Sequence, residues 1–276
     1  SARDVYRYLH RAEILIEAKP IAVGVRLEHP QSLIDEIRYH SPEGRGKYLP
    51  AAEYVYKAQA EGRGVYSFCM CPGGFVVPAS TGPEETVVNG MSPANRGSRW
   101  ANSGLVVELH PEDIPATGIR VEDPTSPLAL MQWCEAFERK SYLAANRSLR
   151  APAQRMTDFV AHRHSSTLPS SSYTMGLTSS DLHEWIPDFI TRRLSAGFRA
   201  FDRTTRGFLT GEAQLIGVES RTSSPVRIPR DRMTYAHPIV AGLYPAGEGA
   251  GFAGGIVSAA IDGENASQQI ALALGR

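Results

Sequence analysis

The sequence has little cysteine, no excess charge of either sign and no long hydrophobic run. Its 276 residues include 29 basic and 29 acidic side chains. This balance gives no electrostatic reason to expect binding to nucleic acid or to an anionic membrane surface. No apolar run approaches the roughly 20 residues that a membrane-spanning helix needs. Three cysteines are a small and odd set, which favours a reducing compartment over a disulfide framework. We therefore expect a soluble, cytoplasmic protein.

The sequence also lacks an initial methionine. Residues 1–15 have helical periodicity, and either Ser1 or Asp4 is placed to cap that helix. No apolar segment follows a basic end, so a signal peptide is not expected. A chain that opens inside a secondary-structure element suggests a fragment of a longer protein.

The middle of the chain mixes strands and helices without strict alternation. Strands are expected at 21–27, 65–68, 75–77, 86–88 and 104–109, and residues 210–228 are expected to be mostly extended. Helices are expected to begin at Pro30 and Pro187, and a third is expected over 126–146. Pro-Gly-Gly and Thr-Gly-Pro turns separate the three strands within 64–89, which predicts a β-meander. In the helix at 126–146, Leu130, Cys134 and Phe137 line one face. The pattern favours an α+β region over roughly residues 21–235.

The tail contains a glycine cluster between an apolar run at 239–244, predicted to be a strand, and an amphipathic stretch at 256–261, predicted to be a helix. Its glycines are Gly247, Gly249, Gly251, Gly254 and Gly255. Glycines let backbone approach a ligand closely, and a helix N-terminus favours an anion such as a phosphate. Glu248 would then accept hydrogen bonds from sugar hydroxyls. A plain tight connection explains the same pattern, and the spacing departs from G-x-G-x-x-G.

Two cysteines two residues apart, Cys69 and Cys71, precede Pro-Gly-Gly. They are interpreted as a redox pair, as half of a metal site or as small residues packed at a strand end. A zinc site needs two more soft ligands. The third cysteine, Cys134, lies on a helix face and the histidines are scattered, so no metal site is predicted. Two interpretations of these cysteines stay open: functional residues near a cofactor, or small residues packed in a sheet.

Residues 219–228 place Arg221 and Arg227 among several hydroxyl side chains. A guanidinium can bind a carboxylate or phosphate in a bidentate manner, although a polar loop explains the same composition. His29, at a strand-to-helix turn, is a candidate general acid or base and equally a structural residue.

Seven segments together resemble one family, the uncharacterised bacterial FAD-dependent dehydrogenases, also described as NAD(FAD)-utilising dehydrogenases. This family is related more distantly to the BaiN-like flavoproteins. The segments include Gly64-Val-Tyr-Ser-Phe-Cys-Met-Cys-Pro-Gly-Gly74 and Leu243-Tyr-Pro-Ala-Gly-Glu-Gly-Ala-Gly-Phe-Ala-Gly-Gly255. The others are 1–4, 24–31, 88–92, 101–103 and 219–228.

The resemblance implies that an N-terminal G-x-G-x-x-G unit, which holds the ADP half of FAD, belongs to a longer parent chain. Residues 1–20 would be an end piece of a Rossmann-like FAD-binding α/β domain, 21–235 an inserted α+β substrate-side domain, and 236–276 the C-terminal closing segment. The FAD-binding residues would be Gly247, Glu248, Gly249, Gly251, Ala253, Gly254 and Gly255. The first three would lie by the ribityl–pyrophosphate part of FAD, and a helix from Ala253 would direct its N-terminus at the flavin or the pyrophosphate.

By the same resemblance the parent would be a flavin-dependent oxidoreductase acting on an unidentified small molecule. Cys69, Cys71 and Arg221 would lie on the catalytic face, with Arg221 anchoring an acidic group of the substrate. A flavin-binding or partner-binding module without turnover is the alternative, and an RNA-associated protein is one form of it. Balanced charge argues against RNA, because RNA binding calls for a basic stripe. A self-standing α+β binding domain is a third interpretation.

Overall fold

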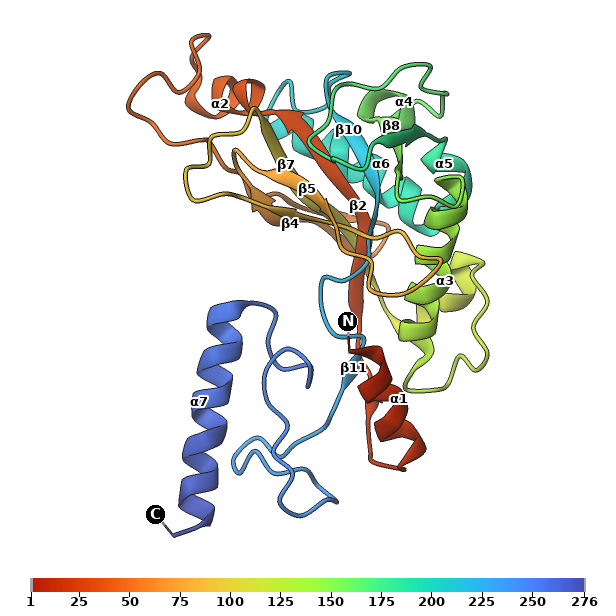
Figure 1. Cartoon of the computed structure of the whole chain (residues 1–276), viewed down its shortest axis with the longest axis vertical. Helices are drawn as coiled ribbons and strands as arrows, with labels where there is room; N and C mark the ends of the chain where they lie inside the picture. The colour runs from red at the N-terminus through yellow and green to blue at the C-terminus, as the bar shows by residue number, and fades with distance from the viewer. Residues whose placement is uncertain (1, 276) are drawn as a thin grey trace.

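A computed structural model of the chain describes residues 2–275. Figure 1 shows a body built on a β-sheet, with the first and last parts of the chain lying together below it. We use "body" for residues 20–222 and "terminal segments" for residues 2–19 and 223–275.

The body is organised around one mixed sheet, to which seven strands of the described chain contribute. In spatial order these are β3 (Lys57–Ala60), β4 (Arg63–Cys71), β7 (Trp100–Leu109), β2 (Ile21–Pro30), β10 (Gln214–Glu219), β8 (Ala151–Arg155) and β9 (Leu177–Ser179). All neighbours are antiparallel except β8 and β9. The central pair, β2 and β7, is in register from Ile21 opposite Leu109 to Pro30 opposite Trp100. Pro30 then ends β2 at the start of a helix.

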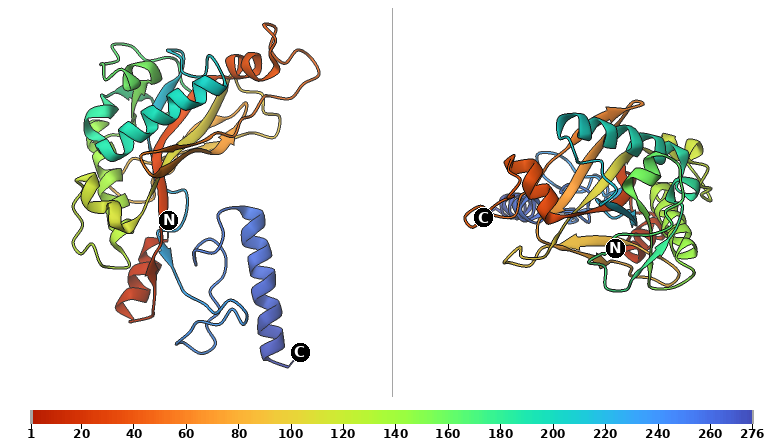
Figure 2. Two further views of the ribbon diagram at one scale, coloured as in Figure 1. Left: turned by 180° about the vertical axis from the view of Figure 1, so that it is seen from behind. Right: turned by 90° about the horizontal axis from the view of Figure 1, so that it is seen from above.

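One face of the sheet carries the main core. Val23, Val25 and Leu27 alternate along β2 and are fully buried in it. The long helices α3 (Ala129–Ala144) and α6 (Asp188–Thr204) pack on this face, as the rear view in Figure 2 shows. The shorter elements of the body are α2 (Gln31–Tyr39), η1 (Pro111–Thr117), α4 (Met156–Val160) and α5 (Leu182–Trp185).

The opposite face of the sheet carries polar side chains of β2 and is covered by a separate two-stranded hairpin. This hairpin pairs β5 (Phe75–Pro78) with β6 (Val88–Met91). Close packing is visible at Gly90, where an added Cβ would meet the guanidinium of Arg26 at 2.0 Å. The predicted meander is therefore wrong in its pairing. Three strands are present, but the third, β6, begins at Val88 and overlaps the predicted 86–88 only there. Pro72-Gly73-Gly74, with Gly73 at φ +52°, turns the chain out of the main sheet after β4.

The terminal segments comprise α1 (Arg3–Arg11), β1 (Glu17–Ala18), β11 (Val226–Arg227) and α7 (Ile256–Ala273). β1 and β11 form a short antiparallel ribbon. A small cluster of Tyr6, Ile16, Leu128, Met131 and Val226 joins these segments to the start of α3. No described helix meets the length and hydropathy needed to cross a membrane.

Two predictions on the terminal segments need correction. Residues 239–244, all described, contain turns and irregular chain and no strand, because Pro238 and Gly242 interrupt the apolar run. The first helix spans Arg3–Arg11 and has Ala2 at its N-cap without a side-chain cap; Asp4 lies within its first turn, and Ser1 lies outside the described residues. The predicted helices in the body are confirmed, including the buried face of Leu130, Cys134 and Phe137. The mixed α and β character is confirmed, while the domain limits stay predictions.

Candidate functional site

The glycine cluster forms a compact turn that is tied to α7. Gly247 and Gly251 have φ values of +77° and +85°, the left-handed region that favours glycine. The Gly247 amide donates to Asp262 Oδ2 over 2.7 Å, and Asp262 also pairs with Arg230 at 2.5 Å. The hydrogen bond from Arg230 is the main cause that lowers the pKa of the Asp262 carboxyl. One carboxylate of the helix therefore holds the turn in place.

Not all glycines of the cluster have the same role. An added Cβ at Gly251 would meet the Val226 carbonyl oxygen at 2.9 Å, so this glycine allows the turn to approach β11. At Gly249 and Gly254 no described atom lies within 4 Å of an added Cβ, and at Gly255 the nearest is Ser258 Oγ at 3.8 Å. The backbone at these three positions is therefore open to a ligand.

The helix N-terminus beside this turn is also open. α7 begins at Ile256 with Gly255 as N-cap, and no side chain of the described residues caps it. Ala253 and Gly254 precede the helix, so the prediction that the helix starts at Ala253 is wrong; the glycine pair delays it by one turn. The free N–H groups of a first turn, together with the helix dipole, favour a bound anion. Glu248 is exposed at the edge of the turn.

Tyr6 of α1 connects this turn with the loop after β10. Its hydroxyl donates to the Gly249 carbonyl oxygen over 2.9 Å and lies 2.9 Å from Ser224 Oγ. A cavity of about 310 Å³ opens beside it. Its lining residues are Ala2, Arg3, Tyr6, Cys134, Ser220, Arg221, Ser223, Ser224, Pro225, Glu248 and Gly249. The structure thus brings three predicted site residues, Arg221, Glu248 and Gly249, to one cavity.

The guanidinium of Arg221 already has several partners. Its Nη1 donates to Thr81 Oγ1 at 2.7 Å, and its Nη2 donates to Glu85 at 2.8 Å and to Glu138 at 3.2 Å. Its buried Nε has no partner among the described residues. Arg221 therefore ties the loop before β6 to α3.

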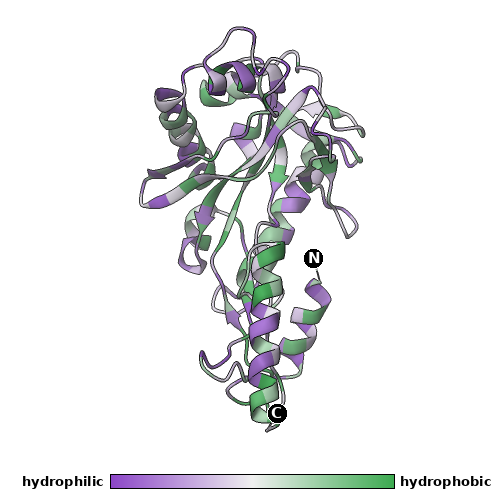
Figure 3. Cartoon of the chain, turned by 90° about the vertical axis from the view of Figure 1, so that its left-hand side faces the viewer, coloured by the Kyte–Doolittle hydropathy of each residue, from purple (hydrophilic) through white to green (hydrophobic). Residues whose placement is uncertain are grey.

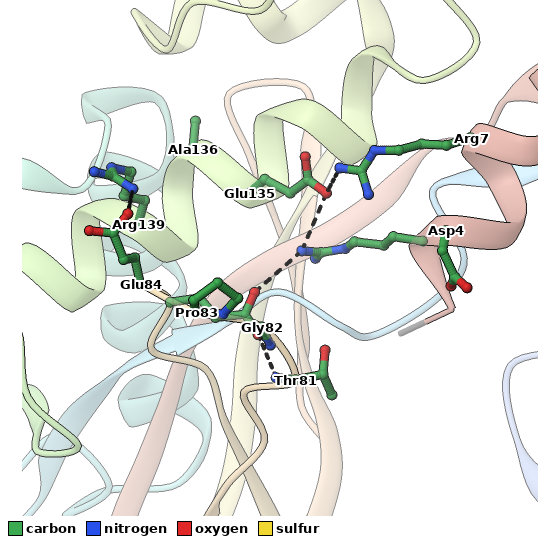
Figure 4. A pocket seen from close by; sticks show the side chains of 11 residues that line it. Asp4, Arg7, Thr81, Gly82, Pro83, Glu84, Glu135, Ala136 and Arg139 are labelled. Atoms are coloured by element: carbon green, nitrogen blue, oxygen red, sulfur yellow. Dashed lines mark hydrogen bonds and ion pairs between the residues drawn. The ribbon is translucent and has the colours of Figure 1, made fainter. Parts of the chain in front are cut away.

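Figure 4 shows that the ion network continues into a second cavity of about 500 Å³. Arg3 of α1 pairs there with Glu85 and Glu135, and Arg7 pairs with Glu135. Arg3 also bonds the buried Glu138 at 2.6 Å. Charged groups therefore link α1 to the body.

The two cysteines form a second, separate cluster on the polar face of the sheet. Cys69 is exposed and Cys71 is buried. The backbone bulges between Phe68 and Cys71, and Cys69 has φ +46°, which is unusual and costly for a residue with a Cβ. Neither cysteine lines the cavity that holds Arg221 and Glu248.

Arg26 organises the cysteine cluster, and its side chain is completely buried. Its Nη2 donates to the Cys69 carbonyl oxygen at 2.6 Å and to Cys71 Sγ at 3.2 Å. Its Nε donates to Asn102 Oδ1 at 2.8 Å, and its Nη1 pairs with Glu219 at 3.0 Å. Burial raises the pKa of Glu219 to about 6, an effect that Arg26 opposes. Sequence reasoning missed Arg26, although a single arginine in the apolar run of β2 was a visible signal.

The candidate roles of His29 and of a metal find no support in the geometry. His29 is fully buried, with Nε2 2.8 Å from the Phe208 carbonyl oxygen, and burial lowers its pKa to about 4. It is a core residue. No group of three or more potential metal ligands occurs within residues 2–275.

The comparisons with known proteins place the chain in a family. Residues 20–222 match the model of the family "FAD-dependent protein, C-terminal domain-like", which is the body as defined above. The chain belongs to this family. It is also 41% identical over 274 residues to an uncharacterised protein of Clostridium beijerinckii, covering 98% of this chain and 50% of that protein. The chain therefore spans about half the length of the curated relative it matches.

Proposed function

We propose that this chain is the C-terminal portion of a FAD-dependent oxidoreductase. The observation that carries the proposal is the open glycine turn beside the uncapped N-terminus of α7, in a chain that belongs to a FAD-dependent family. FAD carries a pyrophosphate and a polyhydroxylated ribityl chain, so a closing segment must offer amide donors and a hydroxyl acceptor. The turn offers both.

The residues present fit one part of FAD. Gly249, Gly254 and Gly255 leave room for close approach to the backbone, and the first amides of α7 are donors for a phosphate or a ribityl oxygen. Gly247 and Gly251 shape the turn, Ala253 joins it to the helix, and Glu248 accepts hydrogen bonds from hydroxyl groups. When bound, FAD would supply the transfer of a hydride or an electron pair. The chain supplies orientation, charge and exclusion of water.

The remainder of the FAD site belongs, in this proposal, to an N-terminal portion of a longer parent. α7 exposes Ile256 at 92%, Val257 at 72% and Ile261 at 53% of their surface, and Figure 3 shows hydrophobic residues near both ends of this helix. Exposed apolar residues grouped on one element indicate a surface that another part covers. We infer that the covering part is a Rossmann-like FAD-binding domain of the parent, and the relative, about twice as long as this chain, supports the existence of a further part.

The body then carries the substrate side. We assign Arg221, which lines the cavity beside Tyr6, as the group that orients an acidic substrate, and Cys69 and Cys71 as thiols of the catalytic face. The substrate is a small molecule whose identity the fold does not specify. A flavin-binding module without turnover would have the same FAD contacts and no substrate-dependent bleaching of the flavin, whether its partner were a protein or RNA.

The first test is the absorbance spectrum from 300 to 550 nm of the purified full-length parent beside that of this chain. We expect flavin bands in the parent and none in the chain. A parent that stays colourless after FAD is added and the excess removed would overturn the proposal. If flavin is bound, its bleaching by a substrate under anaerobic conditions separates an enzyme from a module.

A further inference from the structure

We propose that Cys69 and Cys71 form a dithiol centre that exchanges with small-molecule disulfides and closes to a Cys69–Cys71 disulfide. The inference rests on the exposed Cys69, the buried Cys71 two residues on, and the buried Arg26 of β2, which contacts both. It does not depend on flavin binding, so it can be tested on this chain alone.

The backbone brings the two thiols together. In a regular strand, residues two apart point to the same face but stand almost 7 Å apart. Here the bulge between Phe68 and Cys71 and the positive φ of Cys69 shorten that separation. The Cys71 thiol donates to the Cys69 carbonyl oxygen at 3.4 Å, and one nitrogen of Arg26, Nη2, contacts both residues. A strained conformation at a cysteine is the kind of outlier that points to function rather than to packing.

Arg26 provides the charge that a thiolate needs. It is the only cation described in contact with the pair, and its Nη2 reaches Cys71 Sγ at 3.2 Å. The pKa of Cys69 is lowered to about 5, chiefly by the hydrogen bond from Cys71 with Arg26 contributing, while that of Cys71 is raised. Other titratable groups facing the cluster are Glu219, held by Arg26 at 3.0 Å, and the buried Tyr54. One thiolate per pair is thus favoured, and it is the exposed one.

The reaction follows from this division of roles. The Cys69 thiolate attacks one sulfur of an external disulfide, breaks its S–S bond, forms a mixed disulfide and releases the first thiolate. Cys71 then loses its proton to solvent and attacks the Cys69 sulfur, which forms the internal disulfide and releases the second thiolate. The protein dithiol loses two electrons, and the external disulfide gains two to become two thiols.

The test uses the reduced chain and the disulfide DTNB under native conditions. We expect two thionitrobenzoate ions released per chain, no retained adduct, a mass decrease equal to two hydrogens and a Cys69–Cys71 link in peptide mapping. At about pH 6 the reaction should be roughly fivefold faster than that of glutathione, because the larger thiolate fraction outweighs the lower nucleophilicity.

Variants separate the roles of the thiols. Cys71→Ser should release one thionitrobenzoate and keep an adduct on Cys69, while Cys69→Ser should react at least about tenfold more slowly because Cys71 is buried. Cys134→Ser is the matched control; Cys134 is also buried, and its loss should change neither stoichiometry nor rate. A wild-type chain that keeps its adduct and loses no hydrogens, or reacts no faster than glutathione, would overturn the proposal.

The contribution of Arg26 is tested by Arg26→Lys and Arg26→Gln, with circular dichroism to verify folding. We expect the charge-retaining variant to react faster than the neutral one at about pH 6. Equal rates in two folded variants would refute the role of the cation. If Arg26→Gln does not fold, Arg26→Lys against wild type still reports on the role of Arg26. We expect it to react more slowly than wild type, because a lysine ammonium lacks the planar fork with which the guanidinium reaches Asn102, Glu219 and the cysteine pair together.

Discussion

The body and the terminal segments of this chain both have nearly balanced charge but differ in how much they bury. In the body, whole strands are inaccessible; β10, for example, is buried at every residue. In the terminal segments, the 18-residue helix α7 buries one residue, Ala266. A helix gains most of its stability from packing an apolar face. The body therefore folds around its own core, whereas α7 leaves most of its surface exposed.

The family model follows the same division. It matches residues 20–222 and leaves out both terminal segments, whereas the Clostridium beijerinckii relative aligns over nearly all of the chain. The body is thus the unit that the family defines. The terminal segments are shared with a relative twice as long, which supports their proposed role in closing a site completed elsewhere.

The largest expected contrast comes from deleting a buried and an exposed apolar side chain. Phe137→Ala in α3 removes a fully buried ring and should lower the free energy of unfolding by about 3–5 kcal/mol. Ile256→Ala in α7 should change it by no more than about 0.5 kcal/mol. Urea denaturation of both variants measures this. A large effect at Ile256 would show that α7 belongs to the cooperative unit of the body.

The pH dependence of the body provides the second contrast. His29 has a pKa near 4 in the folded chain and about 6.5 when unfolded, so the unfolded state binds more protons between these values. The contribution of His29 to stability should therefore fall as pH drops from 6.5 to 4, by about 3 kcal/mol. Glu219, with a raised pKa of about 6, works in the opposite direction between about 4.5 and 6 and does so in both proteins. The stability of wild type relative to His29→Gln, measured by unfolding across this range, should therefore fall by about 3 kcal/mol from pH 6.5 to 4; parallel profiles would contradict the assignment.

Within the terminal segments, two glycines should respond differently. Gly251→Ala forces a left-handed backbone on alanine and a Cβ 2.9 Å from the Val226 carbonyl oxygen, which should cost about 1–3 kcal/mol locally. Gly249→Ala meets no described atom within 4 Å and serves as its control. Amide hydrogen exchange of residues 226–255 measures this local loss of stability. Equal protection in the two variants would contradict the packing role of Gly251.

The smallest effect is expected at Glu248, which is exposed and should matter only for the ligand. Glu248→Ala in the full-length parent should weaken FAD binding, and so the retention of FAD after purification, by about tenfold, the lower end of the worth of one hydrogen bond to a charged group, with an unchanged melting temperature of the apoprotein. Glu264→Ala, an exposed carboxylate farther along α7, is the matched control. Unchanged flavin content in Glu248→Ala would remove this residue from the site.

Much of the body was predictable because its signals are local. The alternation in β2, the helical spacing in α3 and α6 and the prolines at helix starts each mark an element through neighbouring residues. The pairing of β5 with β6 apart from the main sheet was not predictable, because it depends on a turn whose geometry two glycines leave free. The prediction of a strand at 239–244 was wrong for a related reason: an apolar run forms a strand only where a partner strand is present.

The candidate sites divide in the same way. The sequence alone determined which residue types are available, namely the tail glycines with Glu248, the Cys69–Cys71 pair and Arg221, because these depend on composition and short spacing. The tertiary structure decided their neighbours. It buried Arg26 against the cysteines, engaged most of Arg221 with Glu85 and Glu138, and bound the glycine turn to Asp262. Such contacts join residues far apart in the chain. Those residues come together only when the strands of the sheet pair and when α1 and α7 take their places.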